Sequence, residues 1–395
     1  MDVTFDQIRS YRLHVHHLDQ KLPSDGIIRA AGACGLQNTP PGTWELSMFN
    51  RIEDCSMQLL QDALYQQKVL LQAWSFRGAP VVFPTAQRDV FLTALLAREG
   101  EQPWIYTRGV TAALDYTGMT FEDVFHRTRH AVKVLDHRSI ERKEVLDRVL
   151  ADIISEDLPP DQQVLWNAPS MYGNPDKQTV GGAAVSFMLR PCSFASLIVF
   201  GERQGSTPVF TSCRSWVGDL PEARAEAGKE LVRKFLHCYG PATRDALMGW
   251  LGCSRQQSER LWNTVSDEIT SVRIGSGTAY ILAADKENLR TGGCEGDKLI
   301  LLGAHDPYLD IKDRNVILED SGRHREVWKF SGNPGAVLKG GRIIGVWRMK
   351  TMKQKIEIRI NLWEAANRAE YQKLQSLAGE YAGFRQLDLT ACVVE

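Results

Sequence analysis

The chain lacks a long hydrophobic run, a charge imbalance and a cationic, apolar N-terminus. No stretch approaches the roughly 18 consecutive apolar residues of a membrane-spanning helix. The opening MDVTFD has no basic region before an apolar core, so we expect no secretory signal. The formal net charge is −1, with 47 Lys or Arg against 48 Asp or Glu, which excludes a global cationic field. Any affinity for nucleic acid must therefore come from a local basic surface.

Closely spaced cysteine pairs are also missing. The eight cysteines include no C-x-x-C pair and are scattered over positions 34, 55, 192, 213, 238, 253, 294 and 392. This distribution is typical of reduced thiols and not of a disulfide or zinc framework. Together with the missing secretory signal, it predicts a cytoplasmic protein.

Histidine and glycine groups give no sign of a cofactor. No carboxylate pattern completes a metal site around His14, His16 and His17. Arginines at 127 and 129 would disfavour a cation on the helical face that carries Glu122, His126 and His130. The glycine pairs at 181–182 and 292–293 do not open a helix after a strand, nor are they followed by the lysine of a phosphate-binding loop. We therefore expect no metal and no other cofactor.

What the chain does have is the composition of an ordinary globular protein. Its 395 residues are 43% hydrophobic and 24% charged, and this length suffices for two to four domains. The most informative stretch reads HCYGPATRDALMGWLGCS, at residues 237–254. The apolar spacing before it predicts a helix that ends at Gly240, and Thr243 and Ser254 are candidate caps of two further helices. Alternating runs at 269–274 and 278–282, joined by Gly-Ser-Gly, then predict a hairpin. Three short helices followed by a hairpin are typical of a winged helix, a helix-turn-helix variant that binds nucleic acid.

Similar patterns occur twice earlier in the chain. Helical spacing in the first 66 residues precedes two candidate strands, at 69–76 and 79–83, around the turn signal Arg77-Gly78. Helices are predicted between 119 and 157, followed by strands at 184–189, 197–200 and 208–211. From about residue 299 the pattern changes to short strands with glycine turns, ending in a helix over 363–381.

These patterns predict an α+β fold of three tandem winged-helix units followed by a small C-terminal β-barrel and a terminal helix. The predicted boundaries are 1–118 for the first unit, 119–220 for the second, 221–290 for the third and 291–395 for the barrel domain. Three such units in one chain favour a monomer over the dimer that is common among winged-helix regulators.

Several motifs together resemble the AlkZ-type winged-helix proteins, bacterial DNA-binding proteins that include DNA glycosylases. They are GLQ at 35–37, WSFRG at 74–78, SLIVFGERQGSTPVF at 196–210, YGPATRD at 239–245, HDPYL at 305–309 with KDR at 312–314, and RIIGVWR at 342–348. The motifs follow one another in the family's order over most of the chain. The resemblance implies double-stranded DNA as the partner, with alkylated or crosslinked bases, and hydrolysis of the N-glycosidic bond of a purine by a monofunctional enzyme.

The resemblance also points to a catalytic motif. Members of this family use Q-Φ-Q or Q-Φ-D, and this chain has Gln37-Asn38-Thr39. Cleavage of an N-glycosidic bond builds positive charge on the sugar, and an amide or carboxylate oxygen can stabilise that charge and orient the attacking water. Side chains two positions apart on an extended segment face the same way, so Gln37 and Thr39 are the catalytic candidates. Thr39 is shorter and less negative than the family's acid or amide, which leaves open a non-catalytic DNA-binding protein, either a regulator or a lesion sensor.

Candidate DNA contacts follow from the charge pattern. Residues 323–359 contain ten Lys or Arg and two Glu, a net charge of +8 within a chain whose total is −1. Trp44, close behind the glutamine motif, is a candidate for base stacking, with a place in the core as the alternative. The expected DNA-binding residues are Trp44, Arg77, Arg203, Arg244, Arg255, Arg342, Arg348, Lys350 and Lys353.

Overall fold

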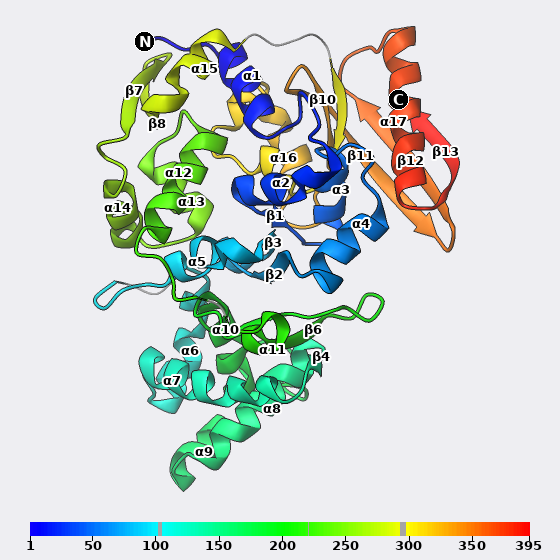
Figure 1. Ribbon diagram of the computed structural model, residues 1–395. Helices are drawn as coiled ribbons and strands as arrows, with labels where there is room; N and C mark the ends of the chain where they lie inside the picture. Colours follow the sequence, from blue (N-terminus) through cyan, green and yellow to red (C-terminus); the bar gives the residue numbers. More distant parts are fainter. Residues whose placement is uncertain (102–104, 220, 293–297) are drawn as a thin grey trace. The chain divides into compact units, whose positions relative to one another are not determined.

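The computed structural model describes residues 1–101, 105–219, 221–292 and 298–395 (Figure 1). The chain divides into two compact units. The first unit contains Met1–Ala63, Val232–Trp250 and Thr264–Glu395, and the second contains Leu64–Leu231 and Leu251–Asn263. The first unit carries the glutamine motif and the C-terminal strands.

The N-terminal part of the first unit is a set of short helices around one brief strand. Helix α1 begins with a capping box, in which the Thr4 hydroxyl accepts from the Gln7 backbone N–H at 3.2 Å and the Gln7 side chain accepts from the Thr4 N–H at 3.0 Å. The elements are α1 (Phe5–Val15), α2 (Ile27–Cys34), β1 (Leu36–Gln37), α3 (Thr43–Phe49) and α4 (Met57–Gln61).

The predicted helix-and-hairpin elements of the third segment are present. Helix α12 (Ala227–Tyr239) ends just before Gly240, α13 (Arg244–Leu251) follows the candidate cap Thr243, and α14 (Arg255–Asn263) follows Ser254. Strands β7 (Ile269–Ile274) and β8 (Gly277–Leu282) pair as an antiparallel hairpin. These elements agree with the sequence because their spacing and caps are local features.

A five-stranded sheet forms the C-terminal part of the first unit. Its order is β13-β12-β11-β10-β9, with antiparallel pairs throughout except for the parallel β12–β13 pair. Helix α17 (Arg368–Phe384) lies along the sheet (Figure 1). The strands are β9 (Leu299–Leu302), β10 (Gly335–Lys339), β11 (Arg342–Met352), β12 (Lys355–Leu362) and β13 (Asp388–Val394).

This sheet corrects two expectations about the C-terminal region. Within the described residues it is an open sheet, with β9 and β13 as its two edges, and no closed barrel is found. The physical reason is that α17 covers the apolar face of the sheet. The Tyr381 and Trp347 rings meet edge-on, with 5.6 Å between their centroids, so this face is buried although the sheet does not close into a barrel. The second expectation was that the fold ends in a helix. The chain instead continues past α17 into β13, which pairs in parallel with β12.

Strands β11 and β12 form a hairpin with one buried and one exposed face. Ile356, Ile358 and Ile360 are buried, whereas the alternate positions are exposed. Cross-strand partners share a face, and the register pairs Arg348 with Arg359 and Lys350 with Glu357. The exposed face of this hairpin therefore carries an excess of positive charge.

The second unit is built mainly of helices around a buried core. Strands β2 (Leu70–Trp74) and β3 (Pro80–Pro84) form the predicted hairpin, and β4 (Ile140–Glu141), β6 (Val209–Ser212) and β5 (Ile198–Phe200) form a small sheet in that order. The main helices are α6 (Thr111–Thr117), α7 (Phe121–Ala131), α8 (Lys143–Glu156), α9 (Pro160–Trp166) and α10 (Val180–Phe194).

One predicted strand is wrong. Residues 184–189 lie inside α10, whose N-cap Thr179 accepts a hydrogen bond from the Gly182 N–H at 3.0 Å. Most of this helix is buried, and a continuous apolar run does not distinguish a buried strand from a buried helix. Gly181 is required by packing, because a Cβ there would lie 2.2 Å from the Trp166 ring.

In the part of the chain that the structure describes, no helix combines the length and the apolar character needed to cross a membrane.

Candidate functional site

The glutamine motif ends β1 and continues into a tight turn in the first unit. Asn38 is buried, with 6% of its surface exposed, while Gln37 is half-buried and Thr39 is exposed. The Asn38 side-chain oxygen accepts from the Gly42 N–H at 2.6 Å. The Thr43 hydroxyl donates to the Gln37 carbonyl at 2.9 Å. Asn38 thus fastens the turn from the inside and leaves the two catalytic candidates on either side of it as the less buried positions.

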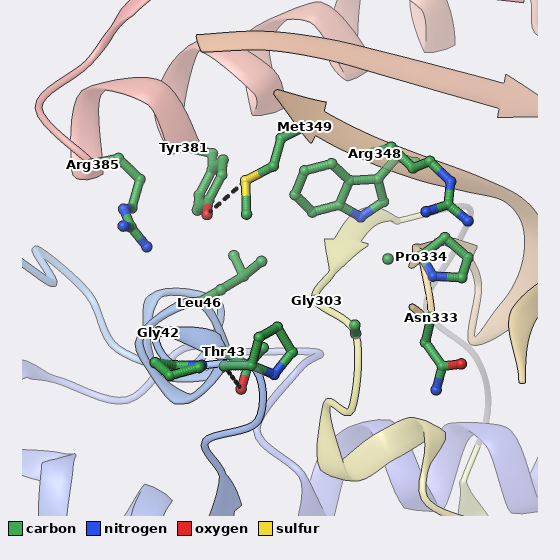
Figure 2. Close-up of a pocket in the computed structure, with 15 residues that line it drawn as sticks. Gly42, Thr43, Leu46, Gly303, Asn333, Pro334, Arg348, Met349, Tyr381 and Arg385 are labelled. Carbon is green, nitrogen blue, oxygen red and sulfur yellow. Dashed lines mark hydrogen bonds between the residues drawn. The ribbon is translucent and has the colours of Figure 1, made fainter. Parts of the chain in front are cut away.

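The turn at residues 40–43 forms one wall of a cavity of about 260 Å³ (Figure 2). Its lining is largely apolar, with Leu46 of α3 on the same side and β11 and α17 opposite. The residues that line it are Pro40, Pro41, Gly42, Thr43, Leu46, Gly303, Ala304, Asn333, Pro334, Gly335, Trp347, Arg348, Met349, Tyr381 and Arg385.

An ion pair closes one side of this cavity. Arg385, which follows α17, donates to Glu45 of α3 at 3.2 Å, and the Glu45 side chain is only 3% exposed. Gly42 packs against the same pair, and its φ of +99° lies in the region that favours glycine. A side chain at position 42 would be strained and crowded, so the glycine keeps the turn close to Glu45.

Aromatic side chains form the opposite wall. The Trp347 indole N–H donates to the Leu302 carbonyl at 2.7 Å, and Gly335 lies so close that a Cβ there would be 2.2 Å from the indole nitrogen. The Tyr381 hydroxyl contacts the Met349 sulfur at 3.4 Å (Figure 2). Burial raises the pKa of Tyr381 above its usual value, so this hydroxyl stays protonated at neutral pH. The cavity thus offers flat apolar surface with a few polar groups at its edge.

The predicted basic residues of the first unit lie in four places. Arg348 lines the cavity, and Lys350 lies two residues further along β11 on the same exposed face. Lys353 lies in the turn between β11 and β12. Arg342 lies 3.9 Å from Glu364 and lines a separate cavity of about 240 Å³. Arg244 begins α13 and is half-buried.

The other predicted basic residues belong to the second unit. Arg77 lies in the turn between β2 and β3 with a φ of +54°, and its stem packs against Gly252. Arg203 lies in the connection between β5 and β6, which is closed by paired backbone hydrogen bonds between Gln204 and Thr207. Arg255 is exposed at the start of α14.

Trp44 is buried in α3, with 2% of its surface exposed. A ring so enclosed offers no face to a base in this conformation, so its place is the core position that was the alternative to stacking. Trp44 is the second residue of α3, which begins at Thr43 directly after the proline and glycine residues.

Asp306, in the motif HDPYL, has two structural roles. It does cap the turn, accepting from the Tyr308 N–H at 3.0 Å, but it also forms a buried bidentate pair with Arg51. The Tyr308 hydroxyl donates to the Gly341 carbonyl at 3.0 Å. Both residues therefore support the segments around the cavity from within the fold.

The histidines of the N-terminal group have separate partners. His14 is 2.8 Å from Asp19, and His16 is 3.0 Å from the Cys238 carbonyl. Across the described ranges, no group of three or more His, Cys, Asp or Glu side chains is arranged to hold a metal ion.

Sequence reasoning missed Asn333, Tyr381 and Arg385 as cavity residues, and Glu45 as the ion-pair partner of Arg385. Glu45 and Arg385 are 340 positions apart, and no local pattern connects them. Asn333 carried a weak signal, since Asn-Pro-Gly at 333–335 is a turn sequence next to a predicted strand.

The chain belongs to the family described as DNA glycosylase AlkZ-like, whose model matches residues 30–384. A relative from Streptomyces sahachiroi, named interstrand DNA cross-link repair glycosylase, is 24% identical over 372 residues, which cover 88% of this chain and 89% of the relative. The solved structure of the Streptomyces sahachiroi DNA glycosylase AlkZ is similar to this chain with a TM-score of 0.76 and 19% identity, over 99% of this chain and 100% of that one. These findings confirm the predicted family and a mixed α+β fold of the same kind.

Proposed function

We propose that the protein is a monofunctional DNA glycosylase that hydrolyses the N-glycosidic bond of alkylated or crosslinked purines in duplex DNA. The observation that carries this proposal is the position of Gln37 and Thr39: they flank the buried Asn38 on the segment whose turn walls the cavity, in a chain of the DNA glycosylase AlkZ-like family. The relative's name indicates an enzyme for interstrand crosslinks, and we extend that substrate class to this chain.

The reaction requires the protein to orient the attacking water and to stabilise the positive charge that develops on the sugar. An alkylated purine carries a positive charge, so it leaves with the electron pair of the glycosidic bond, and the sugar carbon becomes electron-poor. A water then adds its oxygen to that carbon, and its proton passes to the surrounding solvent. The Gln37 amide oxygen and the Thr39 hydroxyl accept hydrogen bonds from this water and face the developing positive charge. No step requires a cofactor.

Duplex binding is assigned to local basic surfaces. Arg348 lines the cavity, Lys350 lies on the same exposed face of β11, and Lys353 lies in the following turn. In the described parts of the chain none of these three makes an ion pair with an acidic side chain, so their charges are available to phosphates. Further phosphate contacts are proposed for Arg77, Arg203, Arg244, Arg255 and Arg342.

The helix-and-hairpin segments are proposed to be three winged-helix units with the boundaries 1–118, 119–220 and 221–290. Three such units in one chain favour a monomer that contacts the duplex through several hairpins. Size measurement of the protein alone and bound to a short duplex tests the stoichiometry.

Base release and duplex affinity, measured together, test the proposed function. The substrate is a methylated genomic duplex containing 7-methylguanine and 3-methyladenine at low salt. The wild type should release base, Gln37→Ala should abolish release, and both should bind the duplex almost equally. Gln375→Ala, an exposed position on α17, is the matched control and should behave as the wild type. Equal loss of release and affinity in Gln37→Ala would make Gln37 structural, and duplex binding without release by the wild type would overturn the assignment of the reaction.

A further inference from the structure

Phe330 is fully exposed, with 109% of its reference surface accessible, whereas the other exposed large hydrophobic side chains among the described residues reach at most 72%. Burying a phenylalanine stabilises a protein by roughly 1.5–3 kcal/mol, so leaving one wholly in water forgoes that gain. Phe330 lies in the loop at 328–334, between α16 (His324–Val327) and β10. This position suggests that the ring is buried by something other than this chain.

The loop that carries Phe330 is held at both ends. The Trp328 indole N–H donates to the Leu309 carbonyl at 3.0 Å, and its ring contacts the Arg314 guanidinium at 4.6 Å. The Lys329 N–H donates to the Asn333 side-chain oxygen at 2.8 Å, which closes the loop into a ring of five residues. Gly332 has a φ of +68°, which allows the chain to reverse. The loop thus presents Phe330 on a fixed base.

The same loop continues directly into the cavity beside the glutamine motif. Asn333, Pro334 and Gly335 line that cavity, and its other wall is the turn at 40–43 that follows Gln37 and Thr39 (Figure 2). Phe330 is therefore only three residues before the cavity wall along the chain. Phe330 is thus close along the chain to one wall of the cavity, whose other wall follows the glutamine motif.

The positive charges near Phe330 favour a polyanion as the ligand that buries its ring. Lys329 and Arg325 are both exposed, and within the described residues neither forms an ion pair. An exposed apolar ring that follows two cations along the chain suits duplex DNA, because the cations can meet phosphates while the ring enters the base stack. Side chains such as Phe, Leu, Ile and Met are inserted between base steps in this way by many proteins that kink a duplex.

We propose that Phe330 is an apolar wedge that enters the duplex between two base pairs and unstacks the nucleotide presented to the cavity beside Gln37. This inference rests on the proposed function, because it takes duplex DNA as the ligand. Unstacking costs a few kcal/mol per base step, and burial of the Phe330 ring offsets part of that cost. Phe330 is a positioning residue, since it touches the neighbouring bases and not the glycosidic bond.

A duplex with 2-aminopurine next to the lesion measures the unstacking, because this base fluoresces more strongly when it leaves the stack. Wild-type protein should increase the fluorescence on binding, and Phe330→Ala should lose most of that increase. Phe330→Leu should keep most of it, since leucine also acts as a wedge. Duplex affinity should fall by less than about tenfold in Phe330→Ala, because phosphate contacts supply most of it. Val164→Ala, the next most exposed apolar position, is the matched control.

The outcomes separate the wedge from the glycosylase. If Phe330→Ala gives the same fluorescence increase as the wild type, the wedge is overturned while base release still stands. If the wild type neither binds the duplex nor releases base, the proposed function fails, and the wedge fails with it. The folded state of Phe330→Ala is checked by thermal unfolding, which should match the wild type because the removed ring is fully exposed and buries no surface against the fold.

Discussion

Arg51 donates two hydrogen bonds to Asp306, from Nη1 to Oδ2 at 2.9 Å and from Nη2 to Oδ1 at 2.8 Å, with both side chains removed from solvent. Arg51 also donates to the Ser47 carbonyl at 2.8 Å. The pair joins the end of α3 to the turn after β9, and both segments contribute residues to the cavity beside the glutamine motif. One buried ion pair therefore joins two of the segments that line the cavity.

Breaking this pair should destabilise the protein strongly. Asp306→Ala leaves the Arg51 guanidinium buried without its counter-charge, and loss of one partner of a buried pair costs about 3–5 kcal/mol. Urea denaturation measures the free energy of unfolding. Asp152→Ala, at an exposed position on α8, should change that free energy by less than about 0.5 kcal/mol. A loss below about 1 kcal/mol in Asp306→Ala would show that the pair does not hold the walls together.

The same pair predicts an acid limit for stability. Burial by itself would raise the pKa of Asp306, but the Arg51 charge and hydrogen bonds outweigh it and hold the pKa below its usual value. A carboxyl with a lowered pKa in the folded state contributes stability at neutral pH, and this contribution is lost as the pH falls through the folded pKa, below about pH 4. The urea midpoint of the wild type should therefore fall in acid. Asp306→Asn should show a smaller fall, and an identical pH profile would contradict the assignment.

Asn38 should be needed for the turn and not for chemistry. Asn38→Ala removes the acceptor of the Gly42 N–H, and an unsatisfied buried donor costs about 1–3 kcal/mol. We expect lower thermal stability together with slower base release, because the turn at 40–43 loosens. Asn38→Asp retains an acceptor oxygen and should be closer to the wild type in release. If Asn38→Ala unfolds at the wild-type temperature, the hydrogen bond does not stabilise the turn.

Thr39 provides a gain-of-function test. Thr39→Asp restores the acidic form of the family motif, so its carboxylate should orient the water and stabilise the sugar cation better than a hydroxyl. Single-turnover base release should accelerate by about tenfold or more, while Thr39→Ala should slow it. Duplex affinity should stay unchanged for both variants. An unchanged rate for both would place Thr39 outside the reaction.

The basic face of β11 should govern the salt dependence of DNA binding. Arg348→Ala and Lys350→Ala should each weaken duplex binding at low salt and reduce the slope of log affinity against log salt by about 1. Binding titrations at several salt concentrations measure the slope. Lys286→Ala, an exposed lysine on α15 (Lys286–Thr291), is the control and should leave the slope unchanged. Equal slopes for all three variants would remove β11 from the DNA-binding surface.

Local pattern was sufficient for much of the fold. The helices that end at Gly240 and begin after Thr243 and Ser254 agree with the sequence because glycine and hydroxyl caps act over a few residues. The strand expected over 184–189 was wrong because a buried helix and a buried strand can both be apolar throughout. The open sheet could not be foreseen, since closure depends on whether a helix such as α17 covers the face.

The sequence by itself determined the family motifs and the basic character of residues 323–359, both of which depend on neighbours along the chain. The expected extended segment is found only as far as Gln37, where β1 ends, and Thr39 lies in the turn that follows. Only the tertiary structure decided that Arg385 meets Glu45, that Trp44 is buried and that Phe330 is fully exposed. The physical reason is that burial and pairing are set by contacts between residues far apart in the chain. Spacing along the sequence does not specify which of those segments meet.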